Sequence, residues 1–346
     1  MFSIPFLVKI IVAKIILSLS YGGFLAYQPA IFSEPPQLAQ VMVKQQQVEN
    51  NLPTKNKKTL PLSIDRIKPQ PKIKEGVVFS SKLSAQSYAV LDLETEKILL
   101  GAEENSPRSI GSISKLMTAI VFLENNPQWD KQIIISKDDG ELGKLYLFDG
   151  EKISVRDLFF TSLVGSSNNA TVALARSGNL NLTDFVKKMN QKALDLGLKN
   201  STFVEPTGLS SENHSTAKEV ALILKYALKQ DLIKEAVTTK NYEISVIGTN
   251  GKNIKRNVIN TDILLFNDFA NSPIKSILGA KTGFIDEAGY CFTMETQNNH
   301  EKKIITVVLG ANTHFDRFSE AKLLAEWVYK NYLWPGEEGF EKLSKE

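Results

Sequence analysis

The sequence predicts an α+β fold in which helices pack against a β-sheet. Short apolar runs typical of strands lie towards both ends of the globular part of the chain, at residues 87–92 (SYAVLD) and 304–311 (IITVVLGA). Longer stretches with helical character lie between them. Strands that enclose a helical middle are typical of a sheet covered by helices, which is why an α+β architecture is expected.

The predicted strands are short apolar runs bounded by polar residues. Residues 87–92 and 97–101 (KILLG) flank the polar segment 93–96, so we expect them to pair as a β-hairpin. Residues 132–136 (QIIIS) form another short strand, and residues 304–311 are apolar enough to form a buried one.

The predicted helices follow from apolar content and capping residues. Residues 112–124 (SISKLMTAIVFLE) are apolar nearly all round, which indicates a buried helix. Ser154 with Asp157 three positions later is close to a capping box that opens another helix. Further helices are expected at residues 168–176, 183–196 with Gly197 as the stop, 216–227 and, as an amphipathic terminal helix, 318–332.

Residues 1–32 are predicted to be a signal peptide or an N-terminal membrane anchor. Lys9 and Lys14 precede an apolar run, and this charge places the following chain outside the cytoplasm. Cleavage and anchoring both stay open, because a spanning helix needs about 20 apolar residues. The stretch at 10–30 reaches that length only if Lys14 snorkels to the interface.

The rest of the chain divides into three parts. Residues 33–76 are rich in Gln, Lys and Pro and lack hydrophobic periodicity, which predicts a flexible linker. Residues 77–333 are predicted to form one globular catalytic domain, and residues 334–346 a short C-terminal tail.

Composition excludes several classes of function. The 346 residues carry 41 Lys and Arg against 38 Asp and Glu, with no basic stripe among aromatic residues, which argues against nucleic-acid binding. The single Cys291 excludes an intramolecular disulfide and a Cys-rich zinc site, and we expect it to be a small core residue. His214, His300 and His314 lack metal-binding spacing. We therefore expect neither a metal nor a cofactor.

Three short motifs occur in a meaningful order. They are an S-x-x-K at residues 112–115, an S-x-N at 166–168 and a K-T-G at 281–283. Each motif alone is weak, because Ser and Lys are common residues. Their order, with steps of 54 and 115 residues between their first positions, is much more specific.

The first motif has the residue types of an activated nucleophile. A serine hydroxyl needs a base within hydrogen-bond reach, and residues three apart on a helix share a face, so Lys115 is the candidate general base for Ser112. Burial and a neighbouring positive charge both lower the pKa of a lysine, and Lys281 is expected to supply that charge. The start of the helix favours developing oxyanion charge.

The other two motifs supply groups for the rest of an acyl transfer. Ser166 is expected to relay a proton towards a leaving amine, and Asn168 to bind the substrate amide or the base. Lys281 and Thr282 are expected on an edge strand, where they hold a terminal carboxylate. Gly283 is expected to leave room for substrate along that strand.

In these three motifs the sequence resembles the D-alanyl-D-alanine carboxypeptidase and endopeptidase family, the low-molecular-mass penicillin-binding proteins. Residues 205–223 (EPTGLSSENHSTAKEVALI) and 279–293 (GAKTGFIDEAGYCFT) are also similar to family segments, and the similarity spans about 84–332. The resemblance implies a β-lactamase/transpeptidase-like fold, with an antiparallel sheet packed by helices and a mainly helical subdomain.

The resemblance also implies an activity. The chain would be a serine D,D-carboxypeptidase, or a D,D-endopeptidase, that acts on peptidoglycan stem peptides through a Ser112 acyl-enzyme and binds penicillin covalently. It would act in the cell envelope, secreted or anchored to the cytoplasmic membrane. One departure is Ser167-Asn168-Asn169 in place of the frequent Gly-Asn-Asp. The absence of a further β-rich domain, with Glu205 before the P-T-G-L segment, favours the endopeptidase branch.

Two alternative functions and one residue stay open. Glu205 lies between the second and third motifs, where a class A β-lactamase holds its deacylating glutamate, so β-lactam hydrolysis is the first alternative. A non-catalytic β-lactam or wall sensor is the second, although all three motifs are intact. Arg317 is either a ligand of the substrate carboxylate near Lys281 or a surface residue at a helix start.

Overall fold

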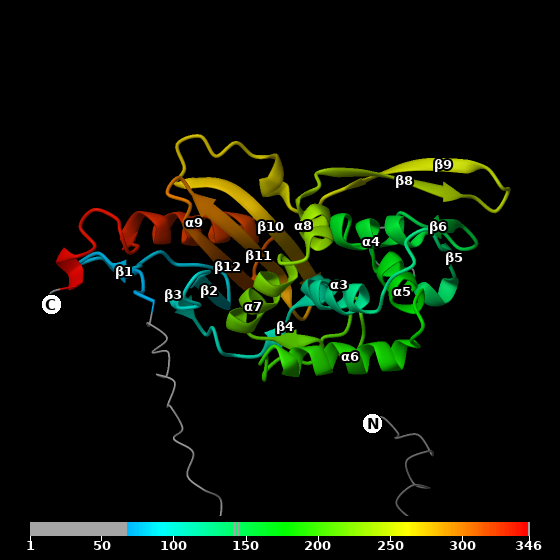
Figure 1. The fold of residues 1–346 in the computed structure, drawn as a ribbon, viewed down its shortest axis with the longest axis horizontal. Helices are drawn as coiled ribbons and strands as arrows, with labels where there is room; N and C mark the ends of the chain where they lie inside the picture. The colour runs from blue at the N-terminus through cyan, green and yellow to red at the C-terminus, as the bar shows by residue number, and fades with distance from the viewer. Residues whose placement is uncertain (1–67, 141–142, 144, 345–346) are drawn as a thin grey trace, which may run out of the picture. The chain divides into compact units, whose positions relative to one another are not determined.

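A five-stranded antiparallel sheet forms the centre of the fold (Figure 1). The computed structural model describes residues 68–140, 143 and 145–344, so the predicted signal or anchor segment and most of the predicted linker lie outside the described residues. The strand order is β10-β11-β12-β2-β3, which joins the first and last parts of the domain. These strands are β2 Ser87–Asp92, β3 Ile98–Ala102, β10 Ile274–Ile285, β11 Gly289–Asn298 and β12 Lys303–Ala311.

Helices cover both faces of this sheet, and side chains therefore alternate between two cores. In β2, Ala89 and Leu91 pack in a core with α3 and α7, whereas Val90 packs on the other face with α9. A strand buried on both faces reads as a continuous apolar run, as SYAVLD does. The α+β prediction, with its antiparallel sheet, is confirmed.

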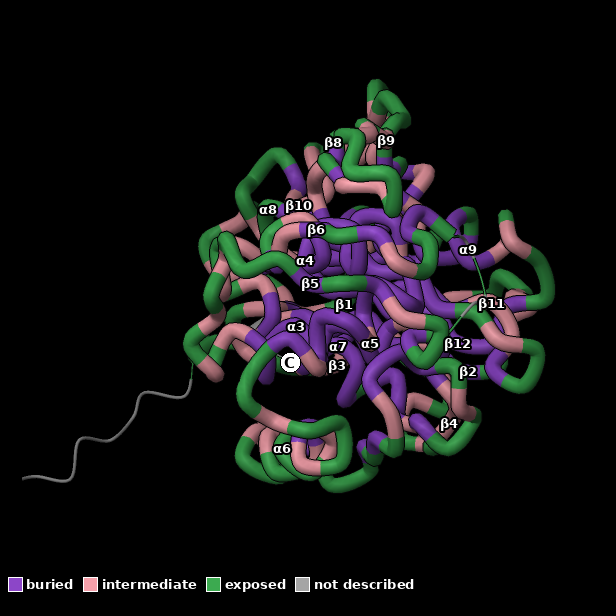
Figure 2. The backbone as a smooth tube through the Cα atoms, turned by 90° about the vertical axis from the view of Figure 1, so that its right-hand side faces the viewer, coloured by how far each residue is buried: buried purple, intermediate pink, exposed green. Residues whose placement is uncertain are grey.

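Several helices make up the middle of the chain, and Figure 2 shows α3, α4 and α7 within the buried interior and α6 at the surface. Side chains cap several of them, as predicted for Ser154, whose Oγ accepts from Asp157 N at 3.0 Å. The bounds are α3 Ser114–Glu124, α4 Val155–Val164, α5 Asn168–Arg176, α6 Leu182–Asp195, α7 Ala217–Ala227, α8 Asp231–Thr238 and α9 Asp316–Asn331.

The segment 112–124 differs slightly from its prediction as one helix. A 3-10 turn, η3 Gly111–Ile113, precedes α3, so Ser112 lies in the turn and Lys115 in the helix proper. Every residue from Ser114 to Phe122 is buried, as predicted. Each large apolar side chain buried in this way contributes roughly 1.5–3 kcal/mol, so α3 is firmly anchored beneath the η3 turn.

A second, four-stranded sheet is a feature that the sequence analysis did not predict beyond residues 132–136. Its order is β5-β6-β8-β9, and the long β8–β9 hairpin extends beyond α4 in Figure 1. β8 reads NYEISVI, an alternation that indicates a strand with one buried face. The bounds are β5 Gln132–Ile134, β6 Lys152–Ser154, β8 Asn241–Ile247 and β9 Asn253–Ile259.

Short elements also lie outside the predicted limits of the domain at 77 and 333. β1 Lys72–Ile73 pairs with β13 Tyr332–Leu333, and the buried Trp334 donates its ring N–H to Asp92 Oδ1 at 2.7 Å. The remaining small elements are β4 Arg108–Ser109 paired with β7 His214–Ser215, and the 3-10 turns η4 Lys137–Asp139, η5 Ile263–Phe266 and η6 Lys342–Ser344.

Candidate active site

Three glycines bring the η3 turn, which contains Ser112, into backbone contact with its neighbours. A Cβ on Gly208 would lie 1.9 Å from Gly111 O, and one on Gly111 would lie 2.6 Å from Phe284 N. A Cβ on Gly283 would lie 2.2 Å from Ile110 O. Side chains do not fit at such distances, so glycine is required at all three positions. The space that Gly283 leaves is thus occupied by the η3 turn, whereas the sequence analysis expected substrate there.

Lys115 lies directly beneath Ser112. Its side chain is fully buried, and Nζ lies 2.7 Å from Ser112 Oγ, from Asn168 Oδ1 and from Thr207 O. A neutral amine has two hydrogens and one lone pair. Asn168 Oδ1 and Thr207 O have no hydrogen to give and take the two N–H bonds. The lone pair of neutral Lys115 then points at the hydroxyl proton of Ser112.

The pKa of Lys115 is suited to proton transfer. Burial lowers this pKa from 10.5 to about 7, because removing the ammonium from water disfavours its charged form. The neighbouring charge that acts on Lys115 is that of Glu205, which works in the opposite direction. Of the two causes expected from the sequence, burial is therefore the main one, and the expected contribution of Lys281 is not seen. Lys281 is itself a group whose pKa falls well below its usual value, because of burial and then because of the charge of Lys115.

Lys281 and Ser166 form the second contact of the site. Lys281 lies on β10, the edge strand of the sheet, as predicted, and its buried Nζ donates to Ser166 Oγ at 2.7 Å and to Thr282 O at 3.2 Å. Ser166 has a φ of 56°, which is uncommon for a residue other than glycine. Such backbone strain is concentrated at functional sites, and here it turns the Ser166 hydroxyl towards the edge strand.

Arg317 lies against the same strand rather than on the surface. Only 5% of it is exposed, and Nη1 donates to Gly283 O at 3.2 Å. Its guanidinium lies 4.7 Å from the ring centroid of Phe318 and 5.4 Å from that of Tyr290. The surface interpretation is therefore wrong, because Arg317 is buried between the edge strand and these aromatic rings. Burial lowers the pKa of Arg317 to about 10, so it stays charged near neutral pH.

Glu205 holds a turn beside the base. Its carboxylate accepts hydrogen bonds from the backbone N–H groups of Thr207 and Gly208 and from Asn213 Nδ2. This turn presents Thr207 O to Lys115. Thr207 and Gly208 are functional positions that the sequence analysis quoted only as part of a similar segment, since a carbonyl contact leaves no signal in residue type.

The cysteine and two of the histidines lie outside the contacts of the three motifs. Cys291 is fully buried in β11, as expected for a small core residue, where it is the register partner of Gly283. His214 pairs with Ser109 in the short β4–β7 ladder, and His300 is exposed in the turn before β12. The Cys291 thiol and the His214 ring contact backbone carbonyls outside the three motifs, so neither is placed to act as a base.

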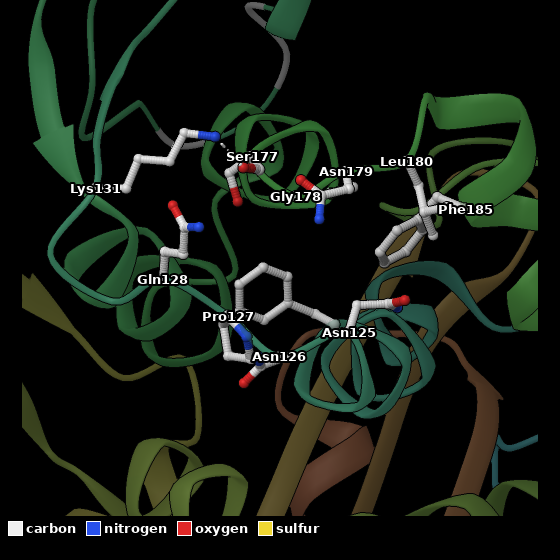
Figure 3. Close-up of a pocket in the computed structure, with 12 residues that line it drawn as sticks. Asn125, Asn126, Pro127, Gln128, Lys131, Ser177, Gly178, Asn179, Leu180 and Phe185 are labelled. Carbon is white, nitrogen blue, oxygen red and sulfur yellow. Dashed lines mark hydrogen bonds between the residues drawn. The ribbon is translucent and has the colours of Figure 1, made fainter.

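A cavity at the other end of α3 is separate from this site (Figure 3). It is lined mainly by the loop after α3 and the α5–α6 connection, and its volume is about 30 Å³, which is enough for a few water molecules. Two of its polar groups have partners within the protein, since Lys131 Nζ donates to Ser177 O at 2.6 Å and Asn125 Nδ2 to Val121 O at 2.6 Å. No residue of the three motifs reaches it.

The geometry of the three motifs agrees with comparisons to known proteins. A family model described as D-alanyl-D-alanine carboxypeptidase matches residues 74–313, most of the described chain. The chain belongs to this family. The resemblance recognised from the motifs is thereby confirmed, and so are the enzyme class and its action on peptidoglycan as a serine-type carboxypeptidase or endopeptidase.

Relatives fall into both named activities. A D-alanyl-D-alanine endopeptidase of Pseudomonas aeruginosa is 33% identical over 75% of this chain and 81% of its own length. A D-alanyl-D-alanine carboxypeptidase of Bacillus subtilis is 29% identical over 72% of this chain and 63% of its own length.

Solved structures extend the likeness to the fold. A Streptomyces DD-transpeptidase matches with a TM-score of 0.65 and 28% identity, over 72% of this chain and 98% of that one. A penicillin-binding protein of Listeria monocytogenes in its cefotaxime-bound form matches with a TM-score of 0.61 and 30% identity, over the same shares.

Proposed function

We propose that Ser112 is the nucleophile of this peptidase and that Lys115 is its general base. The observation that carries the proposal is the contact of 2.7 Å between Lys115 Nζ and Ser112 Oγ, together with a pKa near 7 for that lysine. Near neutral pH about half of such lysines are neutral, which suits general-base catalysis. Ser112 is partly exposed, so a substrate carbonyl has access to its hydroxyl.

Acylation then proceeds in a defined sequence. Lys115 takes the hydroxyl proton, and Ser112 Oγ attacks the carbonyl carbon of the penultimate D-alanine. The N–H groups of Ser112 and Phe284 are proposed to bind the oxyanion, which is supported by the close approach of Phe284 N to the Gly111 backbone. The tetrahedral intermediate collapses when the C–N bond breaks, leaving an ester on Ser112.

The leaving nitrogen must be protonated, and the residue that carries it must be bound in the site. Ser166 is proposed to pass a proton to this nitrogen, supported by its contact with Lys281 on one side of the groove. Asn168 is proposed to orient Lys115 and the substrate amide. Thr282 and Lys281 are proposed to bind the carboxylate of the leaving residue. Gly283 is proposed to act on substrate binding indirectly, because its missing side chain lets the turn that carries Ser112 approach the strand.

Arg317 is proposed to support carboxylate binding through its charge. Its contact with Gly283 O attaches this charge to the edge strand. The group that leaves when the C–N bond breaks is one D-alanine in carboxypeptidase action and the second cross-linked peptide in endopeptidase action. Water then hydrolyses the ester and releases the acyl peptide from Ser112. The leaving group distinguishes carboxypeptidase from endopeptidase action, and relatives with both names support both activities for this chain.

β-Lactams are proposed to acylate the same serine, as the cefotaxime-bound Listeria relative suggests. The engagement of the Glu205 carboxylate by backbone N–H groups argues against the β-lactamase alternative, because those oxygens are not free to activate a deacylating water. The continuous contacts from Ser112 through Lys115 to Asn168 argue against a non-catalytic sensor.

The enzyme is proposed to act outside the cytoplasm, as its peptidoglycan substrate requires. Residues 1–32 would export the chain, as a cleaved signal or a retained anchor, and residues 33–76 would serve mainly as a tether. Among the residues that the structure describes, none of the helices has the length and apolar character to cross a membrane.

Two measurements test this proposal. A fluorescent penicillin should label the wild-type protein covalently, and Ser112→Ala should abolish labelling while the thermal unfolding curve keeps its shape. Labelling of Ser112→Ala would remove Ser112 as the nucleophile. Incubation with cross-linked and uncross-linked muropeptides, followed by release of D-alanine and loss of dimers, then separates carboxypeptidase from endopeptidase action.

A further inference from the structure

A threonine outside the three motifs contacts the K-T-G strand. The hydroxyl of Thr261 lies 2.7 Å from the hydroxyl of Thr282. Thr261 belongs to the short connection between β9 and η5, which no motif singled out. Thr282 is buried and Thr261 is partly exposed, so the pair lies close to the protein surface.

The backbone around Thr261 is fixed before substrate binds. Thr261 N donates to Val164 O at 3.2 Å, at the end of α4. Asn260 N donates to Lys240 O at 2.9 Å, and Asn260 Nδ2 donates to Thr239 O at 2.8 Å. The end of α4 and the connection between α8 and β8 therefore hold this segment, and the Thr261 hydroxyl is presented to Thr282 without further ordering. A group held in this way loses little conformational freedom when the site is used.

Counting hydrogens assigns a direction to the contact. A threonine hydroxyl has one hydrogen and two lone pairs. If Thr282 gives its hydrogen to a substrate carboxylate, it has none to give to Thr261. The hydrogen between the two hydroxyls must then come from Thr261. With substrate bound, Thr261 is the donor and Thr282 both accepts from it and donates to the carboxylate.

We propose that Thr261 is a positioning residue that orients the Thr282 hydroxyl towards the carboxylate of the leaving residue. The inference rests on the proposed role of Thr282 in carboxylate binding. The oriented Thr282 hydroxyl would also discriminate between substrates. A carboxylate on the carbon that bears the leaving nitrogen is favoured, and an amide or ester at that position loses this advantage. The charge of Arg317, which donates from α9 to Gly283 O on the same strand as Thr282, is consistent with an anionic group there.

The test compares an acid with its neutral analogue. Thr261→Val removes the hydroxyl and keeps the shape of the side chain, while Thr261→Ser keeps the hydroxyl and is the matched control. The second-order acylation rate constant is measured with benzylpenicillin and with its methyl ester. We expect Thr261→Val to slow acylation by the acid about tenfold, which corresponds to about 1.4 kcal/mol. Acylation by the ester should change less than about twofold, and Thr261→Ser should match the wild type with both.

The outcomes separate this inference from the proposed function. An equal loss with acid and ester would mean that Thr261 only supports the fold, and no loss with the acid would overturn its role. Wild-type protein that is not acylated at Ser112 would instead overturn the proposed function. If Thr261→Val does not fold, Thr261→Ala removes the same hydroxyl and is measured in the same way.

Discussion

The pH dependence of acylation provides a sharp test of Lys115 as the base. The neutral amine is the active form, so the rate should rise as the pH increases through about 7 and then level off. With that pKa, about one in eleven molecules is neutral at pH 6 and about ten in eleven at pH 8. Acylation should therefore be about tenfold faster at pH 8 than at pH 6.

A lysine that kept its usual pKa would behave differently. With a value of about 10.5, the rate would still rise about tenfold between pH 8 and pH 9. The buried Lys115 predicts a change of only about 10% over the same interval. The assay is the second-order rate constant for labelling by a fluorescent penicillin between pH 5.5 and 9, measured at labelling times shorter than acyl-enzyme decay.

Substitution gives the second arm of this test. Lys115→Arg keeps a positive charge but cannot lose its proton near neutral pH, so acylation should fall by about 10²–10⁴. Lys187→Arg, on the exposed side of α6, is the control and should acylate at the wild-type rate.

A second group titrates in the same pH range as Lys115, because burial raises the pKa of Asp262 to about 7. Asp262→Asn should leave the midpoint unchanged. Wild-type acylation by Lys115→Arg, or a midpoint above 9, would refute the assignment.

Three further predictions concern the surroundings of the base. Glu205→Gln should leave the lifetime of the penicilloyl-enzyme within a fewfold of the wild-type lifetime. It should lower Tm by roughly 5 °C, because an amide N–H would face backbone donors. If the wild-type penicilloyl-enzyme decays rapidly and the variant slows this decay about a hundredfold, the result would favour a β-lactamase. Gly208→Ala should abolish penicillin labelling, since its Cβ would overlap Gly111 O, whereas Gly178→Ala meets no atom within 4 Å and should label normally; normal labelling of Gly208→Ala would contradict the backbone contact. The third prediction compares the free energy of unfolding of Asp262→Asn with that of the wild type, and this difference should be about 2–3 kcal/mol more in favour of the variant at pH 8 than at pH 5. The reason is that a carboxyl group with a raised pKa destabilises the wild type as the pH rises from about 3.8 to 7. Denaturant titrations that give the same difference at both pH values would disprove it.

Most of the chemistry could be read from the sequence because it depends on residue types in a fixed order. Ser112 and Lys115 are three residues apart on a helical segment, so their proximity is a local property of the chain. The apolar composition of α3 also indicated that this lysine would be buried, and burial is the main cause of its lowered pKa. The hairpin β2–β3 and the edge position of β10 followed from short apolar runs and from the family resemblance.

Other parts of the site depend on contacts between distant segments, and no spacing encodes them. Lys115 reaches Thr207 O across 92 residues, and Thr261 meets Thr282 through the packing of one connection against the edge strand. Arg317 had two interpretations in the sequence, and the rings around α9 decided between them. The sequence by itself therefore determined the family and predicted the groups that we propose carry out the reaction. The tertiary structure decided their protonation, orientation and supporting partners, because these depend on what surrounds each group in the folded chain.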